Sequence, residues 1–245
     1  MITPAVSIQQ LMFKHKGQAT YCLNDLTLEV AAGERFGLFG PNGAGKTTLM
    51  NCMTGLLNYE EGSIRLFGDE VKSHRKKINH LFGLVPQDFS FYQELSPVEN
   101  LSFFGAWSGM GKADIKIKTE ELLQVMDLTD VKDKPVHKFS GGMKRRVNLA
   151  IGVIHSPRIL FLDEPTVGVD VHTRQSIISF LKALNEKGTT LIYTSHQLSE
   201  AEELCDRIAL VDKGKILTHG SLTDLLVHHE EDGLEGLFIN LTSKL

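Results

Sequence analysis

Apolar and polar residues alternate in two segments near the N-terminus, at 6–9 and 26–30. A period of two is typical of a β-strand with one buried and one solvated face. Strands of this kind usually form antiparallel sheets. A further strand and turn are predicted at 63–69, so the three segments together indicate an antiparallel β lobe at the edge of a larger core.

Three other segments are apolar without alternation, at 35–39, 159–162 and 190–193. Continuous apolar runs are typical of strands that are buried on both faces of a parallel sheet. From residue 138 onward the predicted order is helix, strand, helix, strand and helix. Asp170 is expected to cap the second of these helices, and Ser199 is expected to cap the third with a capping box. The pattern predicts an α/β fold with a mostly parallel sheet.

Residues 88–139 differ from the rest because they are predicted to be mainly helical and rich in aromatic side chains. Residues 96–99 form a helix start with a capping box, and 112–128 are predicted to form a second, amphipathic helix. Six aromatic residues lie close together at 89–107, namely Phe89, Phe91, Tyr92, Phe103, Phe104 and Trp107. They form the core of a helical subdomain, an exposed docking surface, or both. Phe91 and Tyr92 are the two that we expect to be exposed.

Composition places the chain among ordinary globular proteins, with 245 residues, 42% hydrophobic and 23% charged. The net charge of -4 argues against a protein that coats nucleic acid. Cys22, Cys52 and Cys205 are scattered, which favours a reducing compartment and neither a disulfide framework nor a zinc site. The longest apolar stretch, 147–154, is shorter than the ~20 residues that a spanning helix needs. Work at a membrane is therefore expected to need a separate membrane protein.

A glycine-rich segment at 40–48 carries the strongest chemical signal. It has the sequence Gly-Pro-Asn-Gly-Ala-Gly-Lys-Thr-Thr and fits the phosphate-binding pattern GxxxxGK[ST] at every fixed position. Backbone N–H groups of such a loop point at phosphate oxygens, where the following helix adds its positive dipole. Lys46 would reach the outer phosphates, and the Thr47 hydroxyl would bind Mg²⁺. The expected triphosphate contacts are Gly40, Pro41, Asn42, Gly43, Ala44, Gly45, Lys46, Thr47 and Thr48.

Two carboxylates follow the predicted strand at 159–162. The carboxyl end of a parallel strand beside a phosphate loop is where magnesium would lie, so Asp163 is predicted to be the metal partner of Thr47. Glu164 comes one residue later and points elsewhere, where it can hold an attacking water. As a general base it would contribute roughly 10²- to 10⁴-fold to the rate.

Ser140 precedes a predicted helix at 141–154. Gly141 and Gly142 leave backbone N–H groups uncovered at its start, which makes a second anion site. One triphosphate in one chain has no evident use for two such sites, whereas two copies that face each other head to tail do. A serine-capped helix with a purely structural role is the alternative.

Six motifs in a fixed order give nearly the whole chain a resemblance to the ATP-binding cassette, the nucleotide-binding subunit of an ABC transporter. They are the phosphate loop at 40–47, Val85-Pro86-Gln87 at the Q-loop, residues 139–143 at the signature, 162–165 at the second Walker motif, 168–170 at the D-loop and Thr194-Ser195-His196 at the switch histidine. The resemblance implies a P-loop NTPase core, with Lys46, Gln87, Glu164 and His196 in catalysis and Thr47, Gln87 and Asp163 around the metal.

The sequence departs from the family pattern at two places. The signature has Met143 where glutamine is commonest, and methionine followed by basic residues resembles exporters of drugs, lipids and polysaccharides, as does the tail at 234–242. The aromatic that normally stacks on adenine aligns with His15. An imidazole can stack, and Phe13 or Tyr21 can substitute for it, so adenine is implied by the family alone.

By this resemblance the chain is one ATPase domain over residues 1–245, with a helical subdomain at about 88–139 and a short extension at about 230–245. Two copies are expected to dimerise around two ATP and Mg²⁺, each ATP also contacting Ser140, Gly141 and Gly142 of the other copy. Their partner would be a transmembrane permease subunit at the cytoplasmic face of the membrane, and no nucleic acid is expected.

Two rival functions follow from the same motifs. A soluble ABC-type ATPase of DNA repair or translation usually carries two cassettes or an inserted coiled coil, and residues 1–245 hold neither. A nucleotide sensor without turnover would lack Glu164 or His196, and the sequence has both.

Overall fold

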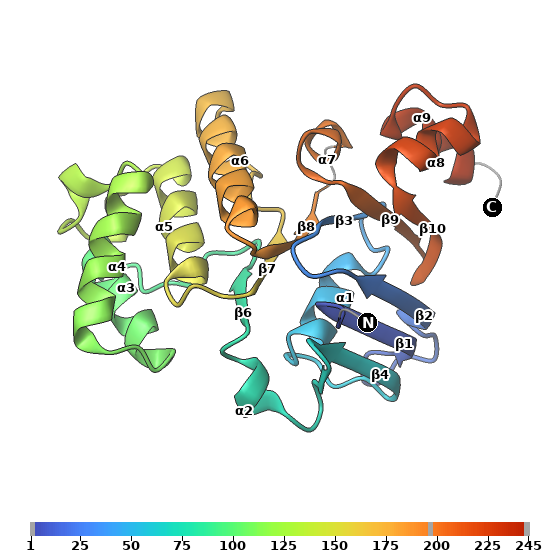
Figure 1. The fold of residues 1–245 in the computed structure, drawn as a ribbon, viewed down its shortest axis with the longest axis horizontal. Helices are drawn as coiled ribbons and strands as arrows, with labels where there is room; N and C mark the ends of the chain where they lie inside the picture. The colour runs from blue at the N-terminus through green and yellow to red at the C-terminus, as the bar shows by residue number, and fades with distance from the viewer. Residues whose placement is uncertain (1–2, 196–197, 243–245) are drawn as a thin grey trace.

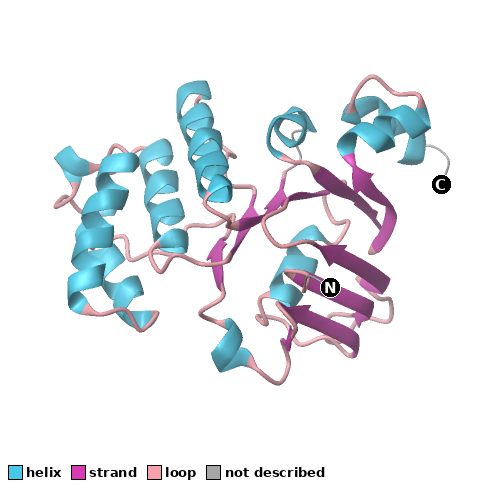
Figure 2. Ribbon diagram, in the orientation of Figure 1, coloured by secondary structure: helices cyan, strands magenta, loops and turns pink. Residues whose placement is uncertain are grey.

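The computed structural model describes residues 3–195 and 198–242 and contains two β-sheets flanked by helices (Figure 1; Figure 2). The larger sheet has the order β10-β9-β3-β8-β7-β6. In chain order its strands are β3 (Arg35–Phe39), β6 (Phe82–Val85), β7 (Ile159–Asp163), β8 (Thr190–Thr194), β9 (Arg207–Asp212) and β10 (Lys215–Ser221). All neighbours from β9 to β6 pair in parallel and β10 pairs antiparallel to β9, so the prediction of a mostly parallel sheet is confirmed.

The smaller sheet is antiparallel, with the order β2-β1-β4-β5. Its strands are β1 (Val6–Phe13), β2 (Leu23–Val30), β4 (Glu61–Leu66) and β5 (Asp69–Glu70). Ile8 pairs with Leu28 on one side and with Ile64 on the other, and all three side chains are buried. The alternating segments therefore direct their apolar residues to one face, as predicted.

Helix α1 (Lys46–Met53) packs between the two sheets. Its side chains Leu49 and Met50 belong to one core cluster with Leu28 of the smaller sheet and Phe161 of the larger sheet. This packing fixes the phosphate loop, which directly precedes α1, against the carboxyl ends of the parallel strands. A short helix, α2 (Arg75–Ile78), follows the smaller sheet.

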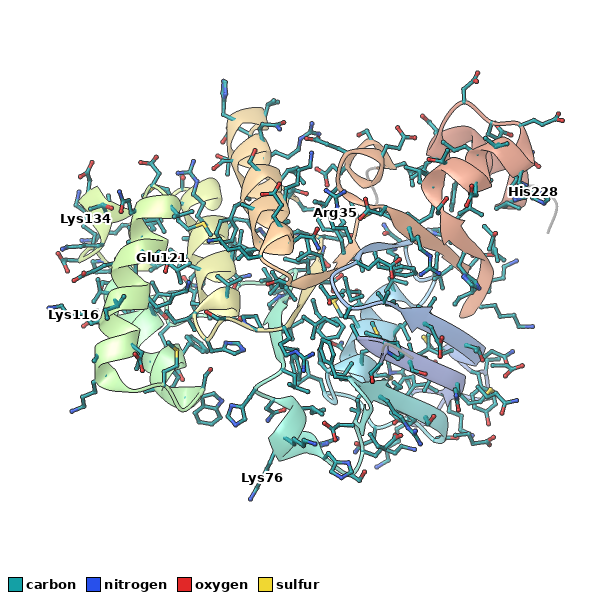
Figure 3. The ribbon with its side chains drawn as sticks, viewed as in Figure 1. Arg35, Lys76, Lys116, Glu121, Lys134 and His228 are labelled. Atoms are coloured by element: carbon teal, nitrogen blue, oxygen red, sulfur yellow. The ribbon has the colours of Figure 1, made fainter. Side chains whose placement is uncertain are left out.

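Three helices pack together at one end of the molecule, shown on the left of Figure 1. They are α3 (Pro97–Trp107), α4 (Lys112–Val125) and α5 (Gly141–Val153), with short 3₁₀ turns η1 (Thr129–Val131) and η2 (Val136–Lys138) between the last two. The capping box of α3 is present, because Ser96 N–H donates to Glu99 at 2.8 Å and Glu99 N–H donates to Ser96 Oγ at 3.3 Å. Lys116 and Lys134 project outward from this end (Figure 3).

The aromatic residues at 89–107 divide between the core and the surface. Phe91 is only 8% exposed and packs in the core cluster, whereas Tyr92 is 51% and Trp107 80% exposed. The expectation that Phe91 is exposed is therefore wrong, and the expectation for Tyr92 is confirmed. Loop residues carry no periodicity, so neighbouring aromatics can point to opposite sides.

The remaining helices are α6 (Val171–Glu186), α7 (Leu198–Leu204), α8 (Leu222–His229) and α9 (Leu234–Thr242). Asp170 caps α6 as predicted, accepting from Thr173 N–H at 2.9 Å. The predicted cap at Ser199 is wrong, because Ser199 lies inside α7. None of the helices in the described ranges is long and apolar enough to span a membrane.

Candidate functional site

The phosphate loop joins β3 to α1 at the carboxyl edge of the large sheet. Gly43 and Gly45 have φ angles of 82° and 107°, which glycine adopts without the penalty that a Cβ would bring. At Gly40 a Cβ would lie 2.0 Å from the Val211 carbonyl oxygen, so no larger residue fits there. The glycines of the motif are thus required by backbone shape and by close packing.

A cavity of about 590 Å³ opens beside this loop. It is lined by His15, Cys22, Asn42, Gly43, Gly45, Lys46, Thr47, Thr48, Gln87, Glu164 and Val167. Gly40 and Pro41 line a smaller neighbouring cavity of about 190 Å³ together with Asn42, while Ala44 is buried behind the loop. Residues from four separate parts of the sequence therefore meet at one cavity.

Lys46 is held by its own loop. Its ammonium donates to the carbonyl oxygens of Gly40 at 2.8 Å and Pro41 at 3.1 Å. Burial lowers the pKa of this ammonium, and the carboxylates of Glu164 and Asp163 act in the opposite direction. An ammonium group that is partly buried and forms hydrogen bonds to carbonyl oxygens is suited to contact an anionic ligand.

Thr47, Asp163 and Thr194 form a hydrogen-bonded chain across three elements. The Thr47 hydroxyl donates to Asp163 Oδ2 at 2.9 Å, and the Thr194 hydroxyl donates to Asp163 Oδ1 at 2.6 Å. Hydroxyl and carboxylate oxygens are the ligands that Mg²⁺ prefers, so the donor set fits that ion. Thr194 was predicted only as a member of a motif, and its bond to Asp163 comes from the pairing of β7 with β8.

Glu164 has a constrained geometry. Its φ of 50° lies in the left-handed region, which is uncommon for a residue other than glycine. Its N–H faces both the carbonyl oxygen and the hydroxyl of Thr194, each at 3.1 Å. Gln87 donates from Nε2 to the Glu164 carboxylate at 3.2 Å, so the Q-loop residue and the expected general base are in direct contact.

Arg145 belongs to the site although the sequence did not single it out. This buried guanidinium donates to the Gln87 carbonyl at 3.0 Å and lies 3.4 Å from the Val167 carbonyl. Its guanidinium carbon lies over the Phe89 ring, 4.9 Å from the ring centre. Burial lowers its pKa, and Asp88 and Glu164 oppose that effect. Arg145 thereby ties the helix after the signature to the loops that carry Gln87 and Val167. The basic run at 144–146 was the only signal for it.

The signature residues occupy a different place. Ser140 caps α5, its hydroxyl accepting from Met143 N–H at 3.3 Å, and both Ser140 and Gly141 are exposed. Ser140, Gly141 and Gly142 are not among the described residues that line the 590 Å³ cavity. The second predicted anion site therefore lies outside the described lining of the chain's own phosphate loop cavity.

The remaining predicted site residues are two histidines, His15 and His196. His15 lines the cavity, with its ring 4.9 Å from that of Phe13. Phe13 is buried, and Lys14 lies over the Tyr21 ring at 5.3 Å. Among Phe13, His15 and Tyr21, His15 is therefore the best placed to contact the adenine ring of a nucleotide. His196, the predicted switch histidine, lies outside the described residues.

Known proteins of one family resemble this chain in sequence. The model of the ABC transporter family matches residues 23–167. Linearmycin resistance ATP-binding protein LnrL of Bacillus subtilis is 40% identical over 200 residues, which are 82% of this chain and 64% of that protein. Nod factor export ATP-binding protein I of Rhizobium sp. is 40% identical over 207 residues, 84% of this chain and 68% of that protein. The chain thus spans about two thirds of the length of these relatives.

Solved structures agree with this relationship. The structure of an ATP-binding subunit of an ABC transporter superposes with a TM-score of 0.90 at 25% identity, covering 97% of this chain and 99% of that chain. A dimeric ATP-binding cassette in a post-hydrolysis state, bound to ADP and Pi, gives a TM-score of 0.81 at 25% identity, covering 89% and 98%. The family model, the relatives and the shared P-loop fold agree, and the chain therefore belongs to the ABC transporter family as one of its ATP-binding proteins.

Proposed function

We propose that this chain hydrolyses ATP in sites shared between two copies and that the cycle of closing and opening powers export by a separate transmembrane protein. The observation that carries the proposal is the division of the expected ligands between two places. Lys46, Thr47, Gln87 and Glu164 line one cavity, and Asp163 is joined to this group by its hydrogen bond with Thr47, whereas the signature lies on an exposed helix start outside the cavity. A second copy would supply the missing anion site.

Each residue then has a defined task. Lys46 and the backbone N–H groups of the phosphate loop, other than at Pro41, bind the phosphates, and Glu164 accepts the proton of the attacking water while Gln87 orients its carboxylate. Mg²⁺, held by Thr47 and Asp163 with Gln87 nearby, would offset the negative charge of the phosphate oxygens. His196 is assigned to the γ-phosphate by family resemblance, and His15 to the adenine ring.

The partner is proposed from the relatives and from one surface. Both relatives are named for resistance or export, which supports an exporter over an importer. Tyr92, Phe103 and Trp107 are exposed, and their rings contact one another through Phe103 at 4.9 and 6.4 Å. Exposed aromatics next to the Gln87 loop are suited to anchor a helix of a permease subunit at the cytoplasmic face of the membrane.

Shared sites have a kinetic signature that tests the proposal. Because two copies must meet, the ATPase rate per chain should rise with protein concentration and level off when dimers dominate. Phosphate release is measured over a hundredfold range of concentration at saturating ATP and Mg²⁺, with Lys46→Ala as the inactive control. A rate per chain that is constant while the protein remains monomeric would contradict the shared site.

A further inference from the structure

Helix α7 directs one carboxylate into the interior of the protein. Glu200 is only 1% exposed, and its Oε2 accepts hydrogen bonds from Tyr193 Oη at 2.6 Å, Thr166 Oγ1 at 2.7 Å and Ser195 Oγ at 3.2 Å. Burial raises the pKa of the Tyr193 phenol, which therefore stays protonated and donates. Burying a carboxylate is costly unless such donors compensate it. The three donors on one oxygen therefore compensate the burial of this carboxylate.

A fourth group faces the other carboxylate oxygen. Arg174 Nη1 lies 3.9 Å from Glu200 Oε1, which accepts no hydrogen bond from the described residues. Arg174 stands in the first turn of α6, where its N–H donates to Asp170 of the D-loop motif at 2.9 Å. Glu200 thus joins α7 to the start of α6 as well as to β8.

The partners of Glu200 lie next to the residues assigned to hydrolysis. Thr166 is two positions after Glu164, and Val167 N–H donates to the Glu164 carbonyl at 3.3 Å, which closes a turn between them. Ser195 directly follows Thr194, the residue that bonds both Asp163 and the Glu164 N–H. Glu200 therefore holds the exit of β7 and the exit of β8 at the same time.

Glu164 has a particular need for such support. A φ of 50° costs a residue other than glycine free energy, and it persists only where the surroundings hold it. Thr194 holds the N–H side of Glu164, and the Thr166–Glu200 bond holds the chain that follows it.

We propose that Glu200 is a positioning residue for ATP hydrolysis, which fixes the loop at 164–169 and the end of β8 so that the Glu164 carboxylate faces the attacking water. Glu200 does not line the nucleotide cavity and touches no reacting atom. This inference rests on the proposed function, because it assigns Glu200 a part in the same hydrolysis.

The structure offers a matched pair of variants to test it. Tyr193→Phe removes one donor from Glu200. Tyr59→Phe removes a bond of the same kind and length, from Tyr59 Oη, just before β4, to Glu70 of β5 at 2.6 Å. Both tyrosines are buried, so each variant loses one buried hydroxyl. A purely structural role predicts the same result for the two.

The positioning role predicts different results. Tyr193→Phe should lower kcat about tenfold, while the KM and the Kd for MgATP stay within about twofold. A tenfold change corresponds to about 1.4 kcal/mol, which is the order of the free energy contributed by one buried hydrogen bond that holds the catalytic loop in place. Amide exchange over 164–169 should become faster. Tyr59→Phe should change neither kcat nor the amide exchange over 164–169, even if its melting temperature falls by as much as that of Tyr193→Phe. Thr166→Val, which removes a second donor, should act like Tyr193→Phe.

The outcomes separate this inference from the proposed function. Unchanged kcat in both Tyr193→Phe and Thr166→Val, or equal losses in Tyr193→Phe and Tyr59→Phe, would overturn the positioning role and leave the ATPase standing. A wild-type protein without hydrolysis would contradict the proposed function. In that case amide exchange still tests the structural part of the inference: faster exchange at 164–169 in Tyr193→Phe alone would show that Glu200 fixes this loop, and equal exchange in Tyr193→Phe and Tyr59→Phe would overturn that.

Discussion

The Thr47 hydroxyl donates a 2.9 Å hydrogen bond to Asp163, although 116 positions separate the two residues. The bond connects the first turn of α1 to the last residue of β7. It exists because β3 and β7 both pair with β8 in parallel, so their carboxyl ends meet at one edge of the sheet. Thr194, at the end of β8, completes the group through Asp163.

The first prediction concerns Thr194. Thr194→Val keeps the shape of a buried side chain and removes the bond that orients the Asp163 carboxylate. A net loss of about 1 kcal/mol corresponds to roughly fivefold, so the Mg²⁺ concentration for half-maximal ATPase should rise by that factor. A titration of ATPase against Mg²⁺ measures it.

Thr190→Val is the control for this experiment, since it removes a hydrogen bond from Gly33 N–H at the opposite end of β8. Its Mg²⁺ requirement should match the wild type. An equal rise of the Mg²⁺ requirement in the two variants would mean that any damage to β8 weakens Mg²⁺ binding, and that the Thr194–Asp163 bond has no specific role in it.

The second prediction concerns Glu164→Gln. Removing the proposed general base should cut turnover by roughly 10²- to 10⁴-fold, while Lys46, Thr47 and Asp163 are expected still to bind ATP. Because unhydrolysed ATP would hold two copies together, light scattering should give a dimer with MgATP and a monomer without it. A variant that binds ATP and remains a monomer would count heavily against the shared site.

The third prediction concerns Ser140→Arg. Ser140 is not among the described residues that line the cavity beside the phosphate loop, so we expect ATP affinity at low protein concentration to stay close to that of the wild type. Hydrolysis should fall sharply, since a bulky cation now blocks the anion site offered to the second copy. Equilibrium binding and phosphate release are compared on one preparation. A parallel loss of affinity would instead place Ser140 in its own chain's pocket.

Local patterns predicted most of the fold because they reflect local physics. Period-two alternation located β1 and β2, and the caps at Ser96 and Asp170 depend on residues three positions apart. Ser199 shows the limit of the same rule. The sequence 199–202 matches a capping box, but α7 begins at Leu198 and Glu200 turns into the core to meet Tyr193. A tertiary contact of this kind leaves no periodic trace.

The candidate site was predictable as far as a motif or the strand order determines it. Lys46, Thr47 and Asp163 meet because parallel strands end at a common edge. Arg145 was not predictable, since its partner Gln87 is 58 positions away and the carbonyl it bonds has no sequence signature. The division between Phe91 and Tyr92 was equally hidden, because a loop gives no period from which to read an inner and an outer face.

The last prediction uses that division. Tyr92 is exposed and contacts the Phe103 ring, so Tyr92→Ala should leave the melting temperature and basal ATPase near wild type while weakening co-purification with the proposed permease subunit. An interface anchor of about 2 kcal/mol corresponds to roughly thirtyfold in affinity.

Phe91→Ala is the matched comparison, since it truncates the neighbouring aromatic inside the core. Loss of a buried phenylalanine costs about 3 kcal/mol or more, so its melting temperature should fall by several degrees before any interface is tested. If Tyr92→Ala also melts early, or if it binds the membrane partner as tightly as the wild type, the exposed rings are not anchors and the permease contacts another surface. The two residues are neighbours in sequence, but Phe91 lies in the core and Tyr92 is exposed to solvent. Comparing the two variants therefore separates an effect on docking from an effect on stability.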